Sequence, residues 1–153
     1  MSASTADGLT VTLTDAPAAA DLKALHAGLE AFNVRVSPPY DRRDLCLFAR
    51  RADGTIAAGL SGYTQWAWLY VDYLWLDDSL RGSGLGSRLL RQAEEEALAR
   101  GCRWSRLYTY DFQAPGFYER HGYGVWGVLE DFPPGHRQIW FRKALTPTAP
   151  AGG

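Results

Sequence analysis

Three glycines at alternate positions occur in RGSGLGSRLL, residues 81–90, just before an apolar repeat typical of a helix. Glycine has no Cβ, so a cluster of glycines marks a tight turn or a close approach of backbone to a ligand. A strand, such a loop and a helix N-terminus together present unpaired N–H groups and the positive end of the helix dipole. This arrangement suits a pyrophosphate, and Arg81 and Arg88 would add positive charge. The alternative is that the glycines only form a tight turn.

Two common phosphate-binding loops do not fit this stretch. A dinucleotide fingerprint needs GxGxxG in the first βα unit, but Ser87 occupies the third glycine position and the loop follows the fourth predicted strand. A triphosphate loop ends in Gly-Lys-Ser or Gly-Lys-Thr, whereas this loop has Arg88 after Ser87. A different kind of pyrophosphate site remains.

A carboxylate interrupts the apolar stretch WLYVDYLWL at Asp72. An acid in a sheet interior is costly unless it serves a purpose. A buried carboxylate can have a raised pKa and accept a proton, directly or through water. Since side chains alternate along a strand, we expect Asp72 on the same face as Leu74 and Tyr70. The alternative is that Asp72 pairs with an arginine or caps strand backbone.

The elements that position these residues follow from periodicity and turn residues. Alternating or continuous apolar runs predict strands over residues 9–14, 44–51, 55–63, 65–76, 103–110, 123–130 and 136–145. Helical spacing predicts helices over residues 17–36, 85–100 and 114–122. The order is β-α-βββ-α-β-α-ββ, which predicts a mixed sheet covered by helices. On the middle helix we expect one apolar stripe of Leu85, Leu89, Ala93 and Ala97 with Leu90 beside it, and we expect Glu94 to Glu96 to form a solvated face.

Length and composition exclude several classes of protein. A chain of 153 residues with 46% hydrophobic residues predicts one globular domain, here over residues 9–145, with disordered ends at 1–8 and 146–153. The net charge of −1 gives no reason to expect a nucleic-acid partner. No apolar run is long enough to span a membrane, no signal peptide is visible, and two cysteines without a CxxC favour neither a disulfide framework nor a metal site. We expect a cytoplasmic protein.

Two motifs resemble those of the GNAT superfamily of acetyl-CoA-dependent N-acetyltransferases. RGSGLG (81–86) has the form Arg/Gln-x-x-Gly-x-Gly/Ala, the pyrophosphate-binding signature of that family. DFQAPGFYERHGY (111–123) is similar to its later motif N-x-x-A-x-x-x-Y-x-x-x-G-F, with Asp111 in place of asparagine. The order of elements also matches. The resemblance covers nearly all of residues 9–145 and implies a mixed α/β sheet, splayed around the cofactor, with helices on both faces.

The resemblance implies roles for particular residues. Acetyl-CoA would be the co-substrate, and no metal is expected. The residues that would contact it are Leu74, Trp75, Leu76, Arg81, Gly82, Ser83, Gly84, Leu85, Gly86, Ser87, Ala114, Phe117 and Tyr118. Tyr118 would also donate a proton toward the leaving thiolate. The general base is left open among Asp72, Tyr70, Glu130, His136 and water.

The acceptor implied by the resemblance is a primary amine, and we expect a small molecule. The aromatic residues of 63–75 would attract an amine by cation–π contact, although ordinary sheet packing explains most of them equally well. The resemblance is compatible with a homodimer. The alternatives are an acetyltransferase of protein lysines or N-termini, and a non-catalytic acyl-CoA-binding sensor or scaffold.

Overall fold

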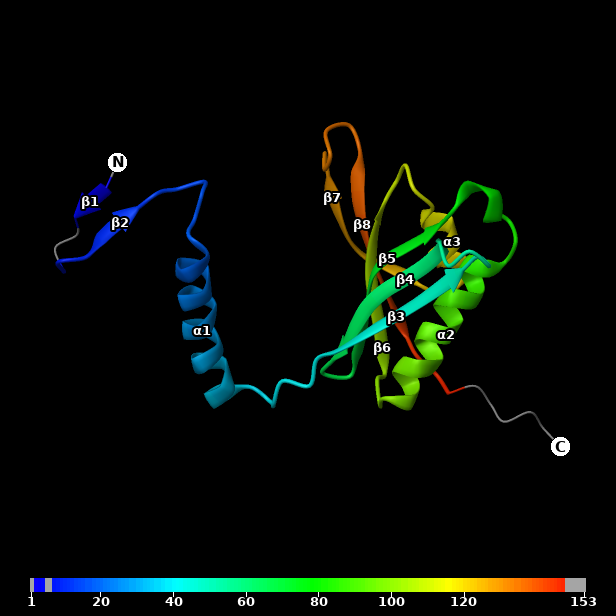
Figure 1. Ribbon diagram of the computed structural model, residues 1–153, viewed down its shortest axis with the longest axis horizontal. Coiled ribbons are helices and arrows are strands. Elements are labelled where there is room, and N and C mark those ends of the chain that lie inside the picture. Colours follow the sequence, from blue (N-terminus) through cyan, green and yellow to red (C-terminus); the bar gives the residue numbers. More distant parts are fainter. Residues whose placement is uncertain (1, 5–6, 148–153) are drawn as a thin grey trace. The chain divides into compact units, whose positions relative to one another are not determined.

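The computed structural model describes residues 2–4 and 7–147. The chain divides into two compact units, Met1–Pro39 and Tyr40–Gly153, which are described separately (Figure 1). Of the ends predicted to be disordered, residues 1, 5, 6 and 148–153 lie outside the described residues. Residues 2–4 form a strand, because they find a backbone partner ten residues or fewer away along the chain.

The first unit contains two short strands and one long helix. β1 (Ser2–Ser4) and β2 (Thr10–Thr12) form a two-stranded antiparallel sheet of their own. The predicted strand 9–14 is thus present only in its middle, and it does not belong to the sheet formed by the other predicted strands. α1 (Ala19–Val36) confirms the first predicted helix. Its apolar stripe is exposed, at Leu22, Leu25, Leu29 and Phe32.

The second unit is built on a six-stranded mixed sheet with the order β3-β4-β5-β6-β8-β7. Its strands are β3 (Arg43–Arg50), β4 (Ile56–Gln65), β5 (Trp68–Leu76), β6 (Trp104–Tyr110), β7 (Gly124–Glu130) and β8 (Arg137–Ala144). Only the pair β5–β6 is parallel; the other neighbouring pairs are antiparallel. The six strands predicted after residue 40 are confirmed, and so is the mixed α/β fold class.

The sheet splits between its two central strands. β5 and β6 pair only where Trp68–Tyr70 meets Trp104–Arg106. Beyond Tyr70, β5 continues alongside β4 as far as Leu76, while β6 continues alongside β8. Each strand therefore keeps one partner and leaves its other edge facing a gap. This is the splay that the family resemblance implies.

Two helices cover one face of this sheet. α2 (Leu85–Ala99) packs against β3, β4 and β5 (Figure 1). It buries the predicted apolar stripe of Leu89, Ala93 and Ala97 together with Leu90. α3 (Pro115–Arg120) packs its aromatic side chains against the same core. Coverage of the opposite face by a helix stays a prediction.

A buried polar network ties α2 to the last strands. The Tyr123 hydroxyl donates to Glu94 Oε1 at 3.0 Å and lies 2.8 Å from Ser105 Oγ. Lys143 Nζ forms an ion pair with Glu94 Oε2 at 2.8 Å. The prediction that Glu94 belongs to a solvated helix face is therefore wrong, because two partners far away in sequence, Tyr123 and Lys143, satisfy its carboxylate. Glu96 forms an ion pair with Arg100 at 2.7 Å on the exposed side of the helix.

Candidate functional site

A short 3-10 helix, Asp78–Leu80, precedes the glycine loop, and the loop leads into α2. Gly82 and Gly84 have φ angles of 75° and 80°, in the left-handed region that favours glycine. A Cβ added at either position would meet no atom within 4 Å. The glycines therefore permit the tight turn and also leave open space beside it, so a tight turn and a pyrophosphate site are compatible interpretations of this loop.

The N-terminus of α2 has no side chain capping it. Gly84 is the N-cap residue and makes no side-chain cap hydrogen bond. Ser83 Oγ donates to the Leu80 carbonyl and accepts weakly from the Leu85 N–H at 3.4 Å. The next N–H groups, at Gly86 and Ser87, are left for another acceptor. A helix N-terminus in this condition attracts an anion through its N–H groups and its dipole.

The loop lies against both the end of β5 and α3. A Cβ built at Gly86 would lie 3.5 Å from Leu76 Cδ1 and 3.6 Å from Phe117 Cζ. Ser87 Oγ lies 2.8 Å from His121 Nε2 at the C-terminus of α3. Burial lowers the pKa of His121, which favours a neutral ring in this contact. The structure thus brings together the three segments predicted to bind the cofactor.

Tyr118 lies on α3 next to Phe117, and its partly buried ring packs against the core of the second unit. Its ring lies 5.1 Å from that of Phe117 and 6.0 Å from those of Phe141 and Tyr123. Burial raises the pKa of Tyr118 to about 12, so its hydroxyl stays protonated at neutral pH. No residue of the described ranges 2–4 and 7–147 accepts a hydrogen bond from it. Ala114, the N-cap of α3, precedes Pro115.

The open edge of β5 carries the three predicted backbone contacts. Leu74 and Leu76 are partly buried and pack against the core, whereas Trp75 is exposed on the other side. In the described part of the chain no strand pairs with this edge of β5 beyond Tyr70. Free backbone groups on such an edge can bind an extended ligand as they would bind an added strand.

Asp72 lies at a β-bulge in β5. Ser61 is paired with Tyr73 and Gly62 with Val71, so Asp72 is an extra residue in the ladder. Leu69 and Val71 are buried before the bulge, and Leu74 and Leu76 face the same core after it. Asp72 is exposed. The prediction of a buried carboxylate on the face of Leu74 is wrong, because a bulge interrupts the two-residue alternation.

The other candidate bases lie in different surroundings. Tyr70 faces outward, and burial followed by the nearby Asp72 carboxylate raises its pKa to about 12. His136 Nδ1 lies 3.0 Å from Asp111 Oδ1, and Asp111 Oδ2 also accepts from the Arg137 N–H at 3.2 Å. Asp111 therefore joins the end of β6 to β8. Glu130 is exposed at the end of β7.

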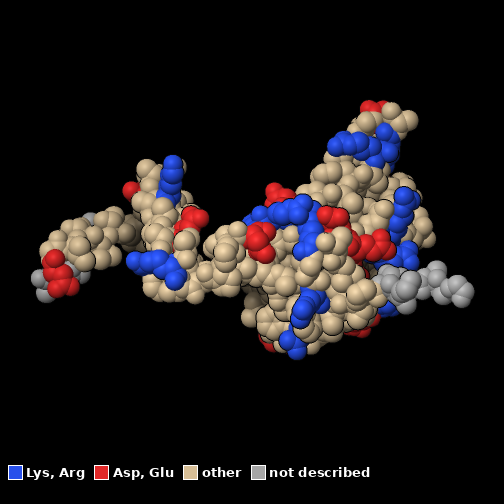
Figure 2. Space-filling model, turned by 90° about the horizontal axis from the view of Figure 1, so that it is seen from below, with Lys and Arg blue, Asp and Glu red and all other residues tan. Residues whose placement is uncertain are grey.

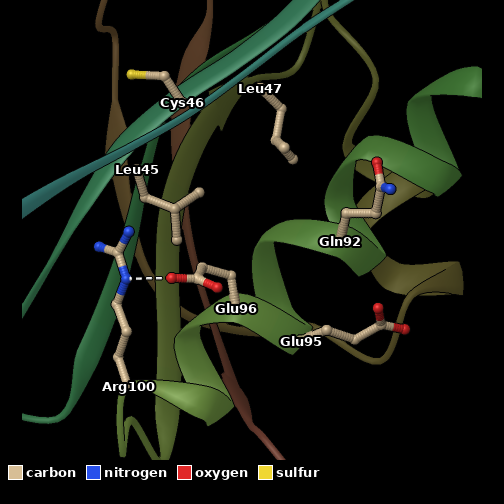
Figure 3. A pocket seen from close by; sticks show the side chains of 7 residues that line it. All are labelled: Leu45, Cys46, Leu47, Gln92, Glu95, Glu96 and Arg100. Atoms are coloured by element: carbon tan, nitrogen blue, oxygen red, sulfur yellow. Dashed lines mark hydrogen bonds and ion pairs between the residues drawn. The ribbon is translucent and has the colours of Figure 1, made fainter.

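Two hollows are present on the second unit. A groove of about 520 Å³ lies between β3 and α2, lined by Leu45, Cys46, Leu47, Gln92, Glu95, Glu96 and Arg100 (Figure 3). The Arg100 guanidinium already binds Glu96, the carbonyls of Arg43 and Asp44, and Thr64, so it stabilises the fold here. A second pocket of about 230 Å³ is lined by Tyr63, Gln65, Trp66, Trp68, Tyr70 and Arg106.

Sequence reasoning missed Arg106 as a pocket residue. The signal was present, since in RWSRLYTY the side chains alternate and Arg106 falls between the buried Ser105 and Leu107.

On the face seen in Figure 2, basic and acidic side chains are interspersed rather than gathered into one basic surface. No described helix is long and apolar enough to cross a membrane. The described residues include no group of three or more His, Cys, Asp or Glu suited to a metal ion.

Several known proteins are similar to this chain in sequence and fold. The family described as Acetyltransferase (GNAT) family matches residues 20–123. Blasticidin-S acetyltransferase of Streptomyces morookaense is 47% identical over 106 residues, which are 67% of this chain and 78% of that protein. An acetyltransferase of Agrobacterium fabrum is 36% identical over 86% of this chain and 96% of its own length. The crystal structure of an acetyltransferase from Bacillus cereus superimposes with a TM-score of 0.80 and 32% identity, covering 88% of this chain and 98% of that one. The chain is therefore an acyltransferase that belongs to the GNAT acetyltransferase family.

Proposed function

We propose that this protein transfers the acetyl group of acetyl-CoA to a primary amine of a small molecule, by direct attack within a ternary complex. One observation carries the proposal: the uncapped N-terminus of α2 lies against the end of β5, beside the gap in the sheet, and against α3, the helix that carries Tyr118. An anion site, an extended backbone edge and a buried proton donor are the three features that an acetyl-CoA-dependent transfer needs.

Residues 81–87 would hold the pyrophosphate. The positive φ angles of Gly82 and Gly84 turn the chain into the N-terminus of α2, whose first N–H groups have no side-chain cap. Arg81 is paired with Asp78 at 3.1 Å, but both side chains are highly exposed, so this pair leaves the guanidinium able to approach a phosphate. The main chain of Leu74, Trp75 and Leu76 would bind the pantetheine arm, while Ala114 and Phe117 would line the site from α3.

Tyr118 would donate a hydrogen bond to the departing thiolate. A phenol with a pKa of about 12 is a weaker acid than a thiol near 8.5, so full proton transfer to sulfur is uphill. The same shift keeps the hydroxyl protonated and ready to donate as charge develops on sulfur. Its lack of a partner among the described residues means that no existing hydrogen bond has to be broken first.

The amine must lose a proton before or during attack. Asp72 is exposed at the bulge and beside the gap, so it would accept the proton through solvent rather than from within a buried site. Tyr70 is a poorer base, since its raised pKa keeps it protonated. Glu130, His136 and water remain the alternatives for this step.

A small-molecule acceptor is supported by the named substrate of one relative. That relative is called a blasticidin-S acetyltransferase, and its aligned region is 47% identical to this chain. We therefore include blasticidin S among the amines to be tested.

The cytoplasm is the predicted compartment of this protein. A homodimer also stays a prediction.

The test combines ligand binding with turnover. Acetyl-CoA should raise the thermal stability of the folded protein, by about 2.7 kcal/mol at one hundred times its Kd. CoA-thiol release should then be followed with acetyl-CoA and a library of amines. No thermal shift at millimolar acetyl-CoA contradicts the cofactor assignment. A thermal shift with no thiol release from any amine contradicts the choice of acceptor.

A further inference from the structure

A pocket on the sheet face opposite α2 and α3 has a half-buried arginine, Arg106, among its lining residues. We call it the outward pocket; it is lined by Tyr63, Gln65, Trp66, Trp68, Tyr70 and Arg106 and has a volume of about 230 Å³. Trp68 and Tyr70 alternate along β5 with the buried residues Leu69 and Val71, which face the helices. Tyr70 and Arg106 are also the last residues that β5 and β6 pair before the gap opens. The outward pocket therefore adjoins the gap.

The Arg106 guanidinium is half-buried among aromatic rings. Its Cζ atom lies 4.4 Å from the centroid of the Tyr70 ring, and Nη2 donates to the Tyr63 hydroxyl at 3.2 Å. No carboxylate of the described residues forms an ion pair with it. A partly buried charge without a counter-ion is costly, and the contacts with rings and a phenol compensate only in part.

A second arginine lies directly opposite. Arg106 on β6 is paired in register with Arg142 on β8, and both side chains point to the outward face. Like charges directly opposite each other destabilise a sheet. Arg142 also forms no ion pair within residues 2–4 and 7–147. An anion bound between the two guanidinium groups would remove both unfavourable features.

A negative charge lies at the other end of the same site. Asp72 is two residues beyond Tyr70 on β5, which corresponds to about 6–7 Å along a strand. Arg106 Cζ lies 4.4 Å from the centroid of the Tyr70 ring, and the bulge leaves Asp72 exposed two residues further along the same strand. A ligand lying across Tyr70 would thus meet a cation at one end and an anion at the other.

We propose that the acceptor is an amine that also carries a carboxylate, with the carboxylate bound by Arg106 beside Arg142 and the amine held near Asp72 at the gap. This inference rests on the proposed acetyl transfer and specifies its substrate class. The planar fork of arginine matches the two oxygens of a carboxylate. The rings of Trp68 and Tyr70 provide flat walls for the part of the acceptor that joins its two charged groups.

Two compounds of the same shape test the proposal. 4-(Aminomethyl)benzoate carries an amine and a carboxylate across one ring, and 4-(aminomethyl)benzamide replaces the carboxylate by a neutral amide. In the CoA-thiol assay we expect the wild-type protein to prefer the benzoate by about 10-fold or more in kcat/KM, mainly through KM, as for a charge-assisted hydrogen bond. Calorimetry with each compound in the presence of CoA measures the same preference without turnover.

Matched variants identify the residue responsible. Arg106→Gln should abolish the preference for the benzoate, while Arg91→Gln, an exposed arginine on α2, should keep it. The acetyl-CoA thermal shift should be unchanged in both, which reports that the fold and the cofactor site survive. If Arg106→Gln does not fold, Arg142→Gln serves instead and should reduce the preference several-fold.

The outcomes separate this inference from the proposed function. Equal binding of the benzoate and the benzamide by the wild-type protein overturns the inference, as does an Arg106→Gln protein that still prefers the benzoate. Failure of the benzoate to bind also overturns it. If other amines are acetylated in any of these cases, the proposed acetyl transfer still holds and only the carboxylate assignment is lost.

Discussion

Replacing Tyr118 by phenylalanine tests the proposed acid with little disturbance of the fold. The change removes one oxygen and keeps the ring, whose contacts with Phe117, Tyr123 and Phe141 hold it in place. The hydroxyl has no partner among the described residues, so its loss leaves no group unsatisfied. We therefore expect the free energy of unfolding at neutral pH to change by no more than about 0.5 kcal/mol.

The expected effect on turnover is far larger. Tyr118 would donate a hydrogen bond as charge develops on sulfur, and removing one such preorganised donor typically costs about 10²–10³-fold in kcat. The kcat of Tyr118→Phe should fall within that range, while the affinity for acetyl-CoA stays the same, since the interaction is made mainly in the transition state. The affinity is measured by calorimetry and the turnover by thiol release.

A control and a refuting result complete this test. Tyr40→Phe removes a hydroxyl from an exposed tyrosine at the start of the second unit and should leave kcat unchanged. If Tyr118→Phe turns over within about two-fold of the wild-type protein, the hydroxyl is not the acid. If its acetyl-CoA affinity falls in proportion to kcat, Tyr118 acts in binding instead.

The remaining predictions concern the loop, the buried network and pH. Gly84→Ala should lose about 1–2 kcal/mol of stability from its positive φ and weaken the acetyl-CoA thermal shift, whereas Gly86→Ala should keep the shift, since its Cβ makes only ordinary contacts. Tyr123→Phe should lower the free energy of unfolding in urea by about 1–3 kcal/mol, because it leaves buried partners unsatisfied. Burial raises the folded-state pKa of Tyr118 from 10.0 to about 12. The contribution of this shift to stability is therefore complete below pH 10 and is lost as the pH rises to 12. Tyr118→Phe should flatten this alkaline decline in stability, and an unchanged decline would contradict the prediction. Asp72→Asn should reduce turnover most at low pH, where too little amine is already deprotonated, and an unaltered pH–rate profile would transfer the base role to Tyr70, Glu130 or water.

Local patterns predicted most of the elements because their causes are local. The glycines at 82 and 84, the apolar stripe of α2 and the Asp53-Gly54 turn each determine the chain within a few residues. These signals located six strands and all three helices. The motif around Tyr118 likewise depends on neighbours in one short segment, which is why its contact with the glycine loop could be anticipated.

The errors arose where two strands or distant segments decide the outcome. Asp72 lies on the outward side because β5 bulges against Gly62, where a side chain would collide with the Tyr70 carbonyl oxygen. A single glycine inside a strand is a signal for a bulge, and the predicted strand TIAAGLSGY (55–63) contains Gly62. Glu94 gave no such signal, because its burial depends on Lys143 and Tyr123 far along the chain.

The split sheet explains how two substrates could meet without a covalent intermediate on the protein. The glycine loop and Tyr118 lie on the face covered by α2 and α3, while Asp72 and Arg106 lie on the opposite face. Because β5 and β6 separate after only three paired positions, the gap joins the two faces at the bulge. Acetyl-CoA could then enter from one side and an amine from the other. Cys46, on β3, and Cys102, buried beside α2, both lie outside this gap, which supports direct attack by the amine over transfer through a thiol of the protein.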